Sequence, residues 1–204
     1  MLGERSKLLV ATGNIGKLNE LSGLLAGMPI ELISLSDIDS FDEIEETGST
    51  FAANAALKAS GYALVAQVPT LADDSGLEVE ALDGRPGVLS ARYGGADLGF
   101  DKKMLMLLAE LDKTGDIQRR ARFVCSIAIA NAAGEIVHSA EGSCHGTLAL
   151  DPRGTNGFGY DPLFIPDGFD QTFGELSDAD KQKISHRARA FCQIIPFLRL
   201  FYAV

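Results

Sequence analysis

The start of the chain constrains the fold most, because a short apolar stretch, a glycine turn and a helical pattern follow one another there. Lys7–Ala11 is typical of a buried strand, and after it Ile15, Leu18, Leu21 and Leu25 recur at helical spacing. A strand that passes through a short polar turn into a helix is how an α/β fold begins.

The rest of the chain continues this alternation of strands and helices. Ser36–Ser49 is an acidic loop, and a hairpin is expected around Asn131–Gly134. We therefore predict an α/β fold with a mixed, twisted sheet and helices packed on it. Further strands are predicted at Ile30–Leu35, Arg122–Ala130 and Glu135–Leu150, and helices at Thr50–Val68, Phe100–Leu111 and Ser177–Leu200, the last with a kink or break near Pro196.

Composition limits the class of protein. The 204 residues are 46% hydrophobic, which suits one domain, 1–204, with two lobes at most. A net charge of -10 argues against a general nucleic-acid surface, so a phosphate ligand needs a local pocket. Cys125, Cys144 and Cys192 form no Cys-x-x-Cys pair and favour neither disulfides nor zinc. No stretch is long enough to span a membrane, and we expect a soluble protein of the cytoplasm.

Two adjacent carboxylates, Asp73 and Asp74, stand where an apolar strand gives way to a serine and a glycine. Adjacent carboxylates repel one another unless a cation lies between them, and such oxygen ligands suit Mg²⁺ that carries a polyphosphate. Asp-Asp-Ser-Gly is also good turn chemistry, so this segment alone leaves both interpretations open.

Thr12–Lys17 lies between the first strand and the first helix. Gly13 and Gly16 let the backbone approach a ligand, the helix N-terminus offers N–H groups, and Lys17 adds a charge. These are the features of a phosphate site, although an ordinary turn with a surface lysine has the same pattern.

Two later segments carry groups suited to a base. In Gly154–Pro162, glycines on both sides of Phe158 would let its ring stack on a planar base, whereas Tyr160 and Phe164 are expected to fold back onto the core. In Lys181–Arg189, His186 and Arg187 could read the edge of a base. The alternative is a solvated basic face on a helix, where Lys183 and Arg187 would lie together.

Five sequence blocks occur together in one order from Leu9 to about Ala190: TGNIGKLNE, EETGSTFAANAALKA, LADDSGLEVEALDGRPGVLSARYGG, GTNGFGYDPLF and KISHRARA. This set resembles the inosine/xanthosine triphosphate pyrophosphatase family, whose members hydrolyse non-standard purine nucleoside triphosphates such as ITP, dITP and XTP to the monophosphate and pyrophosphate. The resemblance implies a long twisted mixed sheet with flanking helices in two lobes around a central cleft. It also implies Mg²⁺ as cofactor and a homodimer.

The resemblance assigns roles to individual residues. Asp74 is implied as general base, with Asp73 supporting it, and Glu45 and Asp74 as ligands of Mg²⁺. Because a bound cation lowers the pKa of a carboxylate, Asp74 is a poor base while it is also a ligand, and we expect Asp73 or Asp74 mainly to orient the attacking water. The implied substrate-binding residues are Thr12, Gly13, Asn14, Ile15, Gly16, Lys17, Lys58, Ser75, Arg92, Phe158, Gly159, Tyr160, Asp161, Lys181, His186 and Arg187.

Two other functions remain open from the sequence. A related pyrophosphatase could prefer pyrimidine or modified triphosphates, which a substrate panel would separate. A nucleotide-binding regulatory module would need the glycine loops and lysines but not Glu45, Asp73 and Asp74.

Overall fold

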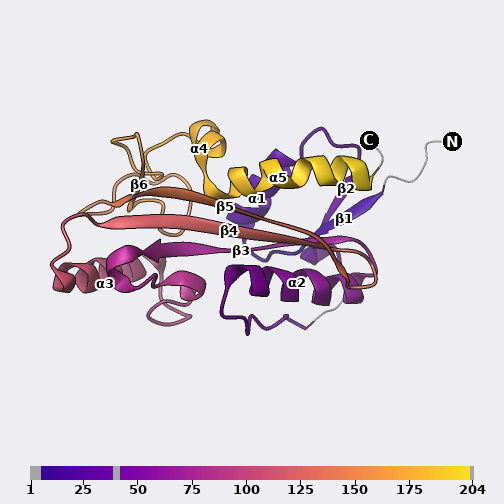
Figure 1. Ribbon diagram of the computed structural model, residues 1–204, viewed down its shortest axis with the longest axis horizontal. Helices are drawn as coiled ribbons and strands as arrows, with labels where there is room; N and C mark the ends of the chain where they lie inside the picture. The colour runs from indigo at the N-terminus through magenta and orange to yellow at the C-terminus, as the bar shows by residue number, and fades with distance from the viewer. Residues whose placement is uncertain (1–5, 39–41, 203–204) are drawn as a thin grey trace. The chain divides into compact units, whose positions relative to one another are not determined.

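The computed structural model describes residues 6–38 and 42–202 of the chain, and the predicted α/β fold is confirmed there (Figure 1). In chain order the elements are β1 (Lys7–Val10), α1 (Ile15–Leu24), β2 (Glu31–Ser34), η1 (Leu35–Asp37), α2 (Phe51–Ala66), β3 (Thr70–Val79), η2 (Glu80–Leu82), η3 (Gly87–Leu89), α3 (Phe100–Thr114), β4 (Arg120–Ala130), β5 (Ile136–Leu148), β6 (Phe164–Pro166), α4 (Asp178–Ile184) and α5 (His186–Phe201).

The described strands form one mixed sheet in the order β2-β1-β3-β4-β5-β6. β1 is parallel to β2 and to β3, while β5 and β6 are antiparallel. β4 and β5 are neighbours joined by the predicted turn, in which the Asn131 N–H donates to the Glu135 carbonyl at 2.9 Å. Parallel pairing at one edge of the sheet and antiparallel pairing at the other make the sheet mixed, as the sequence predicted.

The last predicted helix is divided, and the break lies at a different residue from the one expected. Ser185 has an extended backbone, φ -66° and ψ 155°, so α4 ends at Ile184 and α5 begins at His186. Helix α5 continues through Pro196, so a break at that proline is wrong, and the alternative, a kink there, stays a prediction. The sequence predicted one helix face that carries both Lys183 and Arg187. Because the helix is interrupted at Ser185, these two residues lie in different helices and share no such face.

The chain divides into two compact units. Unit 1 consists of the residues up to Asp74, Cys125–Gly142 and the residues from Ala188 onward, and unit 2 consists of Ser75–Val124 and Ser143–Arg187. Strand β3 contributes Asp74 to unit 1 and the next residue, Ser75, to unit 2.

Unit 1 buries both faces of its part of the sheet. Leu8 and Val10 of β1 pack in a cluster with α1 and α5, whereas Leu9 and Ala11 pack in a cluster with α2. Successive side chains of a strand point to opposite faces, and this explains why α2 and α5 lie on opposite sides of the sheet (Figure 1). The same alternation decides where the side chains of the site point.

Unit 2 has a core of its own. Helix α3 packs Leu107 and Leu111 against the end of β3 and the start of β4. Phe123, Phe164 and Phe173 form an aromatic group within this core, with the rings of Phe123 and Phe164 centred 4.8 Å apart. Phe164 is buried, as the sequence predicted.

Candidate functional site

The loop between β1 and α1 forms a helix N-terminus with its backbone exposed. Asn14 caps α1 by accepting a hydrogen bond from the Lys17 N–H at 3.1 Å, and its own N–H donates to Thr12 Oγ1 at 3.2 Å. Gly13 has open space where a side chain would stand. The cap holds the loop in one conformation, and the first N–H groups of α1 favour an anion nearby.

Asp73 and Asp74 are adjacent in β3 but have different surroundings. Asp73 Oδ2 lies 2.9 Å from Lys17 Nζ of α1 and 3.9 Å from Cys125 Sγ of β4. Asp74 Oδ2 accepts a hydrogen bond from Asn54 Nδ2 of α2 at 3.0 Å. The two carboxylates thus contact different helices, as expected for adjacent strand residues whose side chains point to opposite faces of the sheet.

Helix α2 brings charge to Asp74 and to the acidic loop. Lys58 Nζ lies 2.7 Å from Glu46 Oε1 and 3.8 Å from Asp74 Oδ1. Two carboxylates from two segments of the chain thus lie near one ammonium group. Glu45, the predicted metal ligand, is exposed, whereas its neighbour Glu46 is half-buried and belongs to this group.

The pKa values of this group follow from burial and charge. Burial raises the pKa of the Asp74 carboxyl above its ordinary range and outweighs the lowering by Lys58 and Asn54. Burial acts to lower the pKa of Lys58, but Asp73, Asp74 and Glu46 together raise it. Lys58 is therefore fully charged near neutral pH, while Asp74 is harder to ionise than an exposed aspartate.

In unit 2, the loop before β6 presents Phe158 to two cations. Lys181 Nζ lies 4.8 Å from the centre of the Phe158 ring, and Arg187 Cζ lies 5.5 Å from it. Asp161 Oδ2 accepts from the Phe158 N–H and from Lys181 Nζ, both at 2.7 Å. Gly157 is required there, because its φ is +71° and a Cβ atom would lie 2.1 Å from Asp161 Oδ2.

Tyr160 behaves differently from Phe158, as the sequence predicted. Its ring is buried, and its hydroxyl donates to the Ser90 carbonyl at 3.1 Å. Burial raises the pKa of the Tyr160 hydroxyl. Tyr160 therefore supports the loop from inside unit 2, and Phe158 is the half-buried ring.

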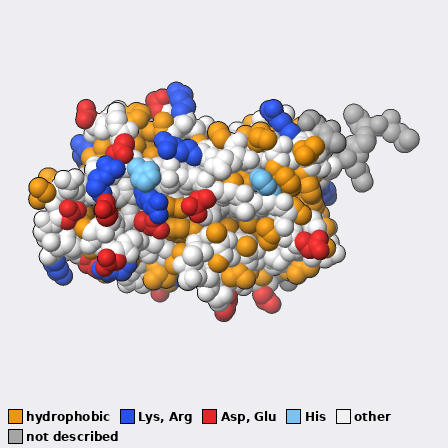
Figure 2. Space-filling model, in the orientation of Figure 1, with side chains coloured by type: hydrophobic (Ala, Val, Ile, Leu, Met, Phe, Trp, Pro, Cys, Tyr) orange, Lys and Arg blue, Asp and Glu red, His pale blue; other side chains and the backbone are white. Residues whose placement is uncertain are grey.

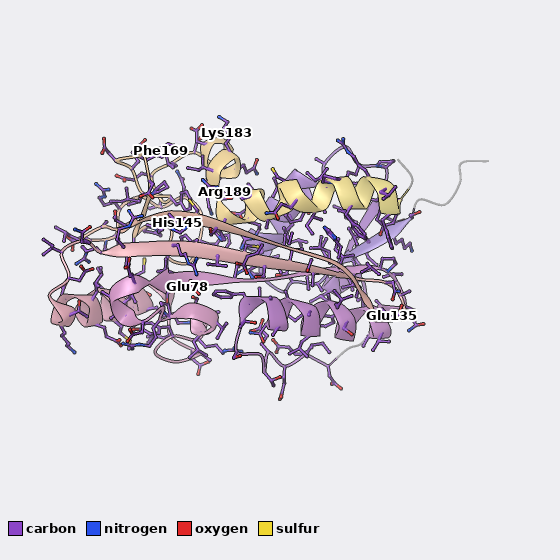
Figure 3. The ribbon with its side chains drawn as sticks, in the orientation of Figure 1. Glu78, Glu135, His145, Phe169, Lys183 and Arg189 are labelled. Carbon is purple, nitrogen blue, oxygen red and sulfur yellow. The ribbon has the colours of Figure 1, made fainter. Side chains whose placement is uncertain are left out.

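The basic segment divides into buried and exposed cations. Lys181 and Arg187 are buried, and Arg187 Nη2 donates to Ser75 Oγ at 3.0 Å. Lys183 is exposed, points away from the ribbon of α4 and pairs with Asp180 at 2.8 Å (Figure 3). A solvated basic face is therefore wrong for Lys181 and Arg187, although it does describe Lys183.

His186 and Arg92 complete the predicted residues of unit 2. His186 is buried and stacks on Phe123, with ring centres 4.8 Å apart and planes at 13°. Arg92 is exposed, in the loop that follows the buried Ser90.

The sequence analysis missed Asn54, which is fully buried beside Asp74. The available signal was its position four residues before Lys58, which places both side chains on one face of α2.

Among the described residues we also looked for three other features: a metal site, a membrane-spanning helix and a basic surface. No set of three or more His, Cys, Asp and Glu side chains among them is arranged to hold a metal ion. In the part of the chain that the structure describes, no helix has the length and hydrophobicity needed to cross a membrane. On the face drawn in Figure 2, Lys and Arg side chains are interspersed with Asp and Glu, so this face carries no continuous basic surface.

Comparisons of the sequence and of the structure with known proteins indicate the same family. Residues 8–197 match the profile of the Ham1 family. A dITP/XTP pyrophosphatase of Rhodospirillum centenum is 49% identical over 92% of this chain and 92% of its own length, and one from Exiguobacterium is 45% identical over 95% of this chain and 99% of its own. A HAM1 protein from Coxiella burnetii has a similar structure, with a TM-score of 0.87 and 38% identity over 95% of this chain and 98% of that one.

Proposed function

The chain belongs to the Ham1 family, and from this we propose that it is a nucleoside-triphosphate pyrophosphatase that hydrolyses non-standard purine nucleoside triphosphates such as dITP and XTP. The products would be the nucleoside monophosphate and pyrophosphate. The observation that carries the proposal is the likeness to dITP/XTP pyrophosphatases over nearly the whole chain. The grouping of Asp74, Glu46 and Lys58 supports a catalyst rather than a binding module, because binding phosphate needs no carboxylates.

We propose that Asp74 and Glu46 hold Mg²⁺. Their carboxylates are oxygen ligands from two segments, both within reach of one cationic group, Lys58 Nζ. Two carboxylates suit Mg²⁺, which commonly takes its remaining ligands from water and substrate phosphates. We prefer Glu46 to the predicted Glu45 because Glu45 is exposed. When bound, the ion would neutralise charge that develops on the departing pyrophosphate.

Other groups of unit 1 would bind the triphosphate. Thr12–Lys17 offers the N–H groups of the α1 N-terminus, and Lys17 is held beside Asp73 at 2.9 Å. Because Asp73 is buried and paired, we propose that it positions Lys17 rather than taking a proton from water. Asp74 would orient the water that attacks the α-phosphorus, displacing pyrophosphate.

We propose that unit 2 selects the base. The Phe158 ring would stack on the purine, and Lys181, His186 and Arg187 would supply hydrogen-bond donors near its edge, with Ser75, Asp161 and Arg92 in supporting roles. Hypoxanthine and xanthine carry a 6-oxo group, which accepts a hydrogen bond, where adenine carries an amine. A buried donor left facing another donor rejects the wrong base strongly.

Three broader predictions accompany this proposal. We propose that residues 1–204 act as a single pyrophosphatase domain, that the protein works in the cytoplasm and that it forms a homodimer.

The direct test is a substrate panel. ITP, XTP, dITP, GTP, ATP and a pyrimidine triphosphate are supplied at equal concentration with Mg²⁺ or with chelator, and pyrophosphate is measured. We expect Mg²⁺-dependent pyrophosphate release from ITP, dITP and XTP, with slow release from GTP and ATP. Orthophosphate as product, preference for a pyrimidine substrate or absence of turnover would contradict the proposal.

A further inference from the structure

Helix α2 contacts both carboxylates of the proposed metal site from a single face. Asn54 and Lys58 are four residues apart, so their side chains lie one turn apart on that face. Lys58 pairs with Glu46 at 2.7 Å, and Asn54 donates to Asp74 at 3.0 Å. The helix therefore offers one cationic donor and one neutral donor.

The Asn54 amide is fully buried and uses both of its ends. Its Nδ2 donates to Asp74 Oδ2 at 3.0 Å, and its Oδ1 accepts the Gly48 N–H at 2.7 Å. A backbone N–H can only donate, so the amide oxygen must face Gly48 and the amide nitrogen must face Asp74. This orientation links the backbone of the acidic loop to the carboxylate of β3.

The approach of Gly48 to α2 leaves no room for a side chain. A Cβ atom on Gly48 would lie 2.7 Å from both Ala53 Cβ and Asn54 Oδ1. The loop is thus tied to α2 through Gly48, through the Glu46 side chain two residues earlier, and through the Ile44 N–H, which donates to the Tyr62 hydroxyl at 3.3 Å. Thr50 then caps the helix by accepting from the Ala53 N–H at 3.1 Å.

We propose that Asn54 is a positioning residue of the pyrophosphatase reaction, which orients Asp74 and holds the loop that carries Glu46 against α2. This inference rests on the function proposed above. Asn54 binds Asp74 Oδ2, and Oδ1 of the same carboxylate lies 3.8 Å from Lys58 Nζ, on the side of Glu46. Loss of the amide would let the carboxylate rotate and the loop move away.

The first experiment uses Asn54→Leu, which keeps the branched shape of the side chain and removes both hydrogen bonds. Its matched control is Asn19→Leu, a change of the same kind at an exposed position of α1. Mg²⁺-dependent hydrolysis of ITP is measured, together with Mn²⁺ binding to the nucleotide-free protein by electron paramagnetic resonance. We expect kcat to fall about 10- to 100-fold and the Mn²⁺ dissociation constant to rise at least fivefold, with KM for ITP changed less than threefold.

A second variant guards against a failure of Asn54→Leu to fold. Asn54→Asp preserves shape and the acceptor for Gly48, but it turns an oxygen toward Asp74. We expect the Gly48 amide resonance to stay in place while kcat falls at least tenfold. Asn19→Asp supplies the charge-matched control.

Outcomes for the two proposals are separable. A folded Asn54→Leu protein with kcat and Mn²⁺ affinity within twofold of the parent would overturn the role of Asn54, as would a kcat within twofold for Asn54→Asp. If the parent protein hydrolysed no triphosphate, the proposed function would fail, whereas weaker Mn²⁺ binding by Asn54→Leu would still support the positioning role.

Discussion

The two units compensate their charged groups in different ways. In unit 1, the group around β3 has three carboxylates, Asp73, Asp74 and Glu46, and two lysines, Lys17 and Lys58. In unit 2, Lys181 and Arg187 lie over the Phe158 ring, and Lys181 pairs with Asp161. An excess of carboxylate suits a metal ion, whereas cations beside an aromatic ring suit an electron-rich planar ligand.

Under the proposed function, this difference assigns catalysis at phosphorus to unit 1 and selection of the base to unit 2. Groups that act on phosphorus should affect all triphosphates equally, because the triphosphate is common to them. Groups that form hydrogen bonds with the edge of the base should affect substrates unequally. Substitutions in the two units should therefore have different kinetic signatures.

The largest effect is expected for Asp74→Asn in unit 1. Loss of the negative charge removes a proposed Mg²⁺ ligand and the group that orients water, so kcat/KM should fall on the order of 10³-fold for both ITP and ATP. Asp42→Asn, at an exposed position of unit 1, is the matched control and should retain full activity. Near-normal turnover by Asp74→Asn, measured as pyrophosphate release, would remove Asp74 from the mechanism.

Arg187→Ala in unit 2 should bring the activities toward ITP and ATP closer together. Its guanidinium is buried, and loss of a buried donor that pairs with the 6-oxo group should reduce the preference for ITP over ATP roughly 10- to 100-fold. Thermal unfolding checks that the variant is folded, and Arg187→Lys keeps the charge without the forked geometry. An unchanged ratio in folded Arg187→Ala would show that another group discriminates between the bases.

A smaller effect is expected for Phe158→Leu. Stacking is tolerant of base identity and is worth roughly 1–3 kcal/mol, so KM should rise by about tenfold for ITP and ATP alike. The matched control is Phe169→Leu, which removes an exposed ring from the same unit and should leave KM unchanged. A change of kcat without a change of KM, measured by steady-state kinetics, would argue against stacking.

The smallest effect is a pH dependence of stability in chelator. Because burial holds the pKa of Asp74 above its value in the unfolded chain, the native state favours the protonated form. The stability from this preference is fully present below the unfolded pKa and is lost as the pH rises through the folded pKa. Asp74→Asn does not titrate there, so its Tm relative to the parent should increase as the pH rises above 3.8, the ordinary pKa of an aspartate. A constant difference in Tm would contradict the raised pKa.

Much of the fold was predictable from local patterns. The strand, cap and helix at Lys7–Leu24 have strong signals, and Thr50 before an alanine-rich segment marks the start of α2. The break at Ser185 was missed because serine is common both within helices and at their ends, while Pro196 carried the stronger local signal.

The site was less predictable, because its members depend on which elements pack together. Spacing indicates that Asn54 and Lys58 share a face, but not that this face meets Asp74 and Glu46. Adjacency of Asp73 and Asp74 did not indicate their partners for the same reason, since strand alternation gives each carboxylate a different neighbouring helix. The resemblance to the family indicated which residues to consider, whereas the contacts between them depend on how the elements pack and are seen only in the structure.

The separation of tasks between the two units is tested most directly by kcat/KM for ITP and ATP in Glu46→Gln and Arg187→Lys. We predict that Glu46→Gln lowers both values by the same factor and leaves their ratio within twofold of the parent, whereas Arg187→Lys changes the ratio at least fivefold. A changed ratio in Glu46→Gln together with an unchanged ratio in Arg187→Lys would contradict this account.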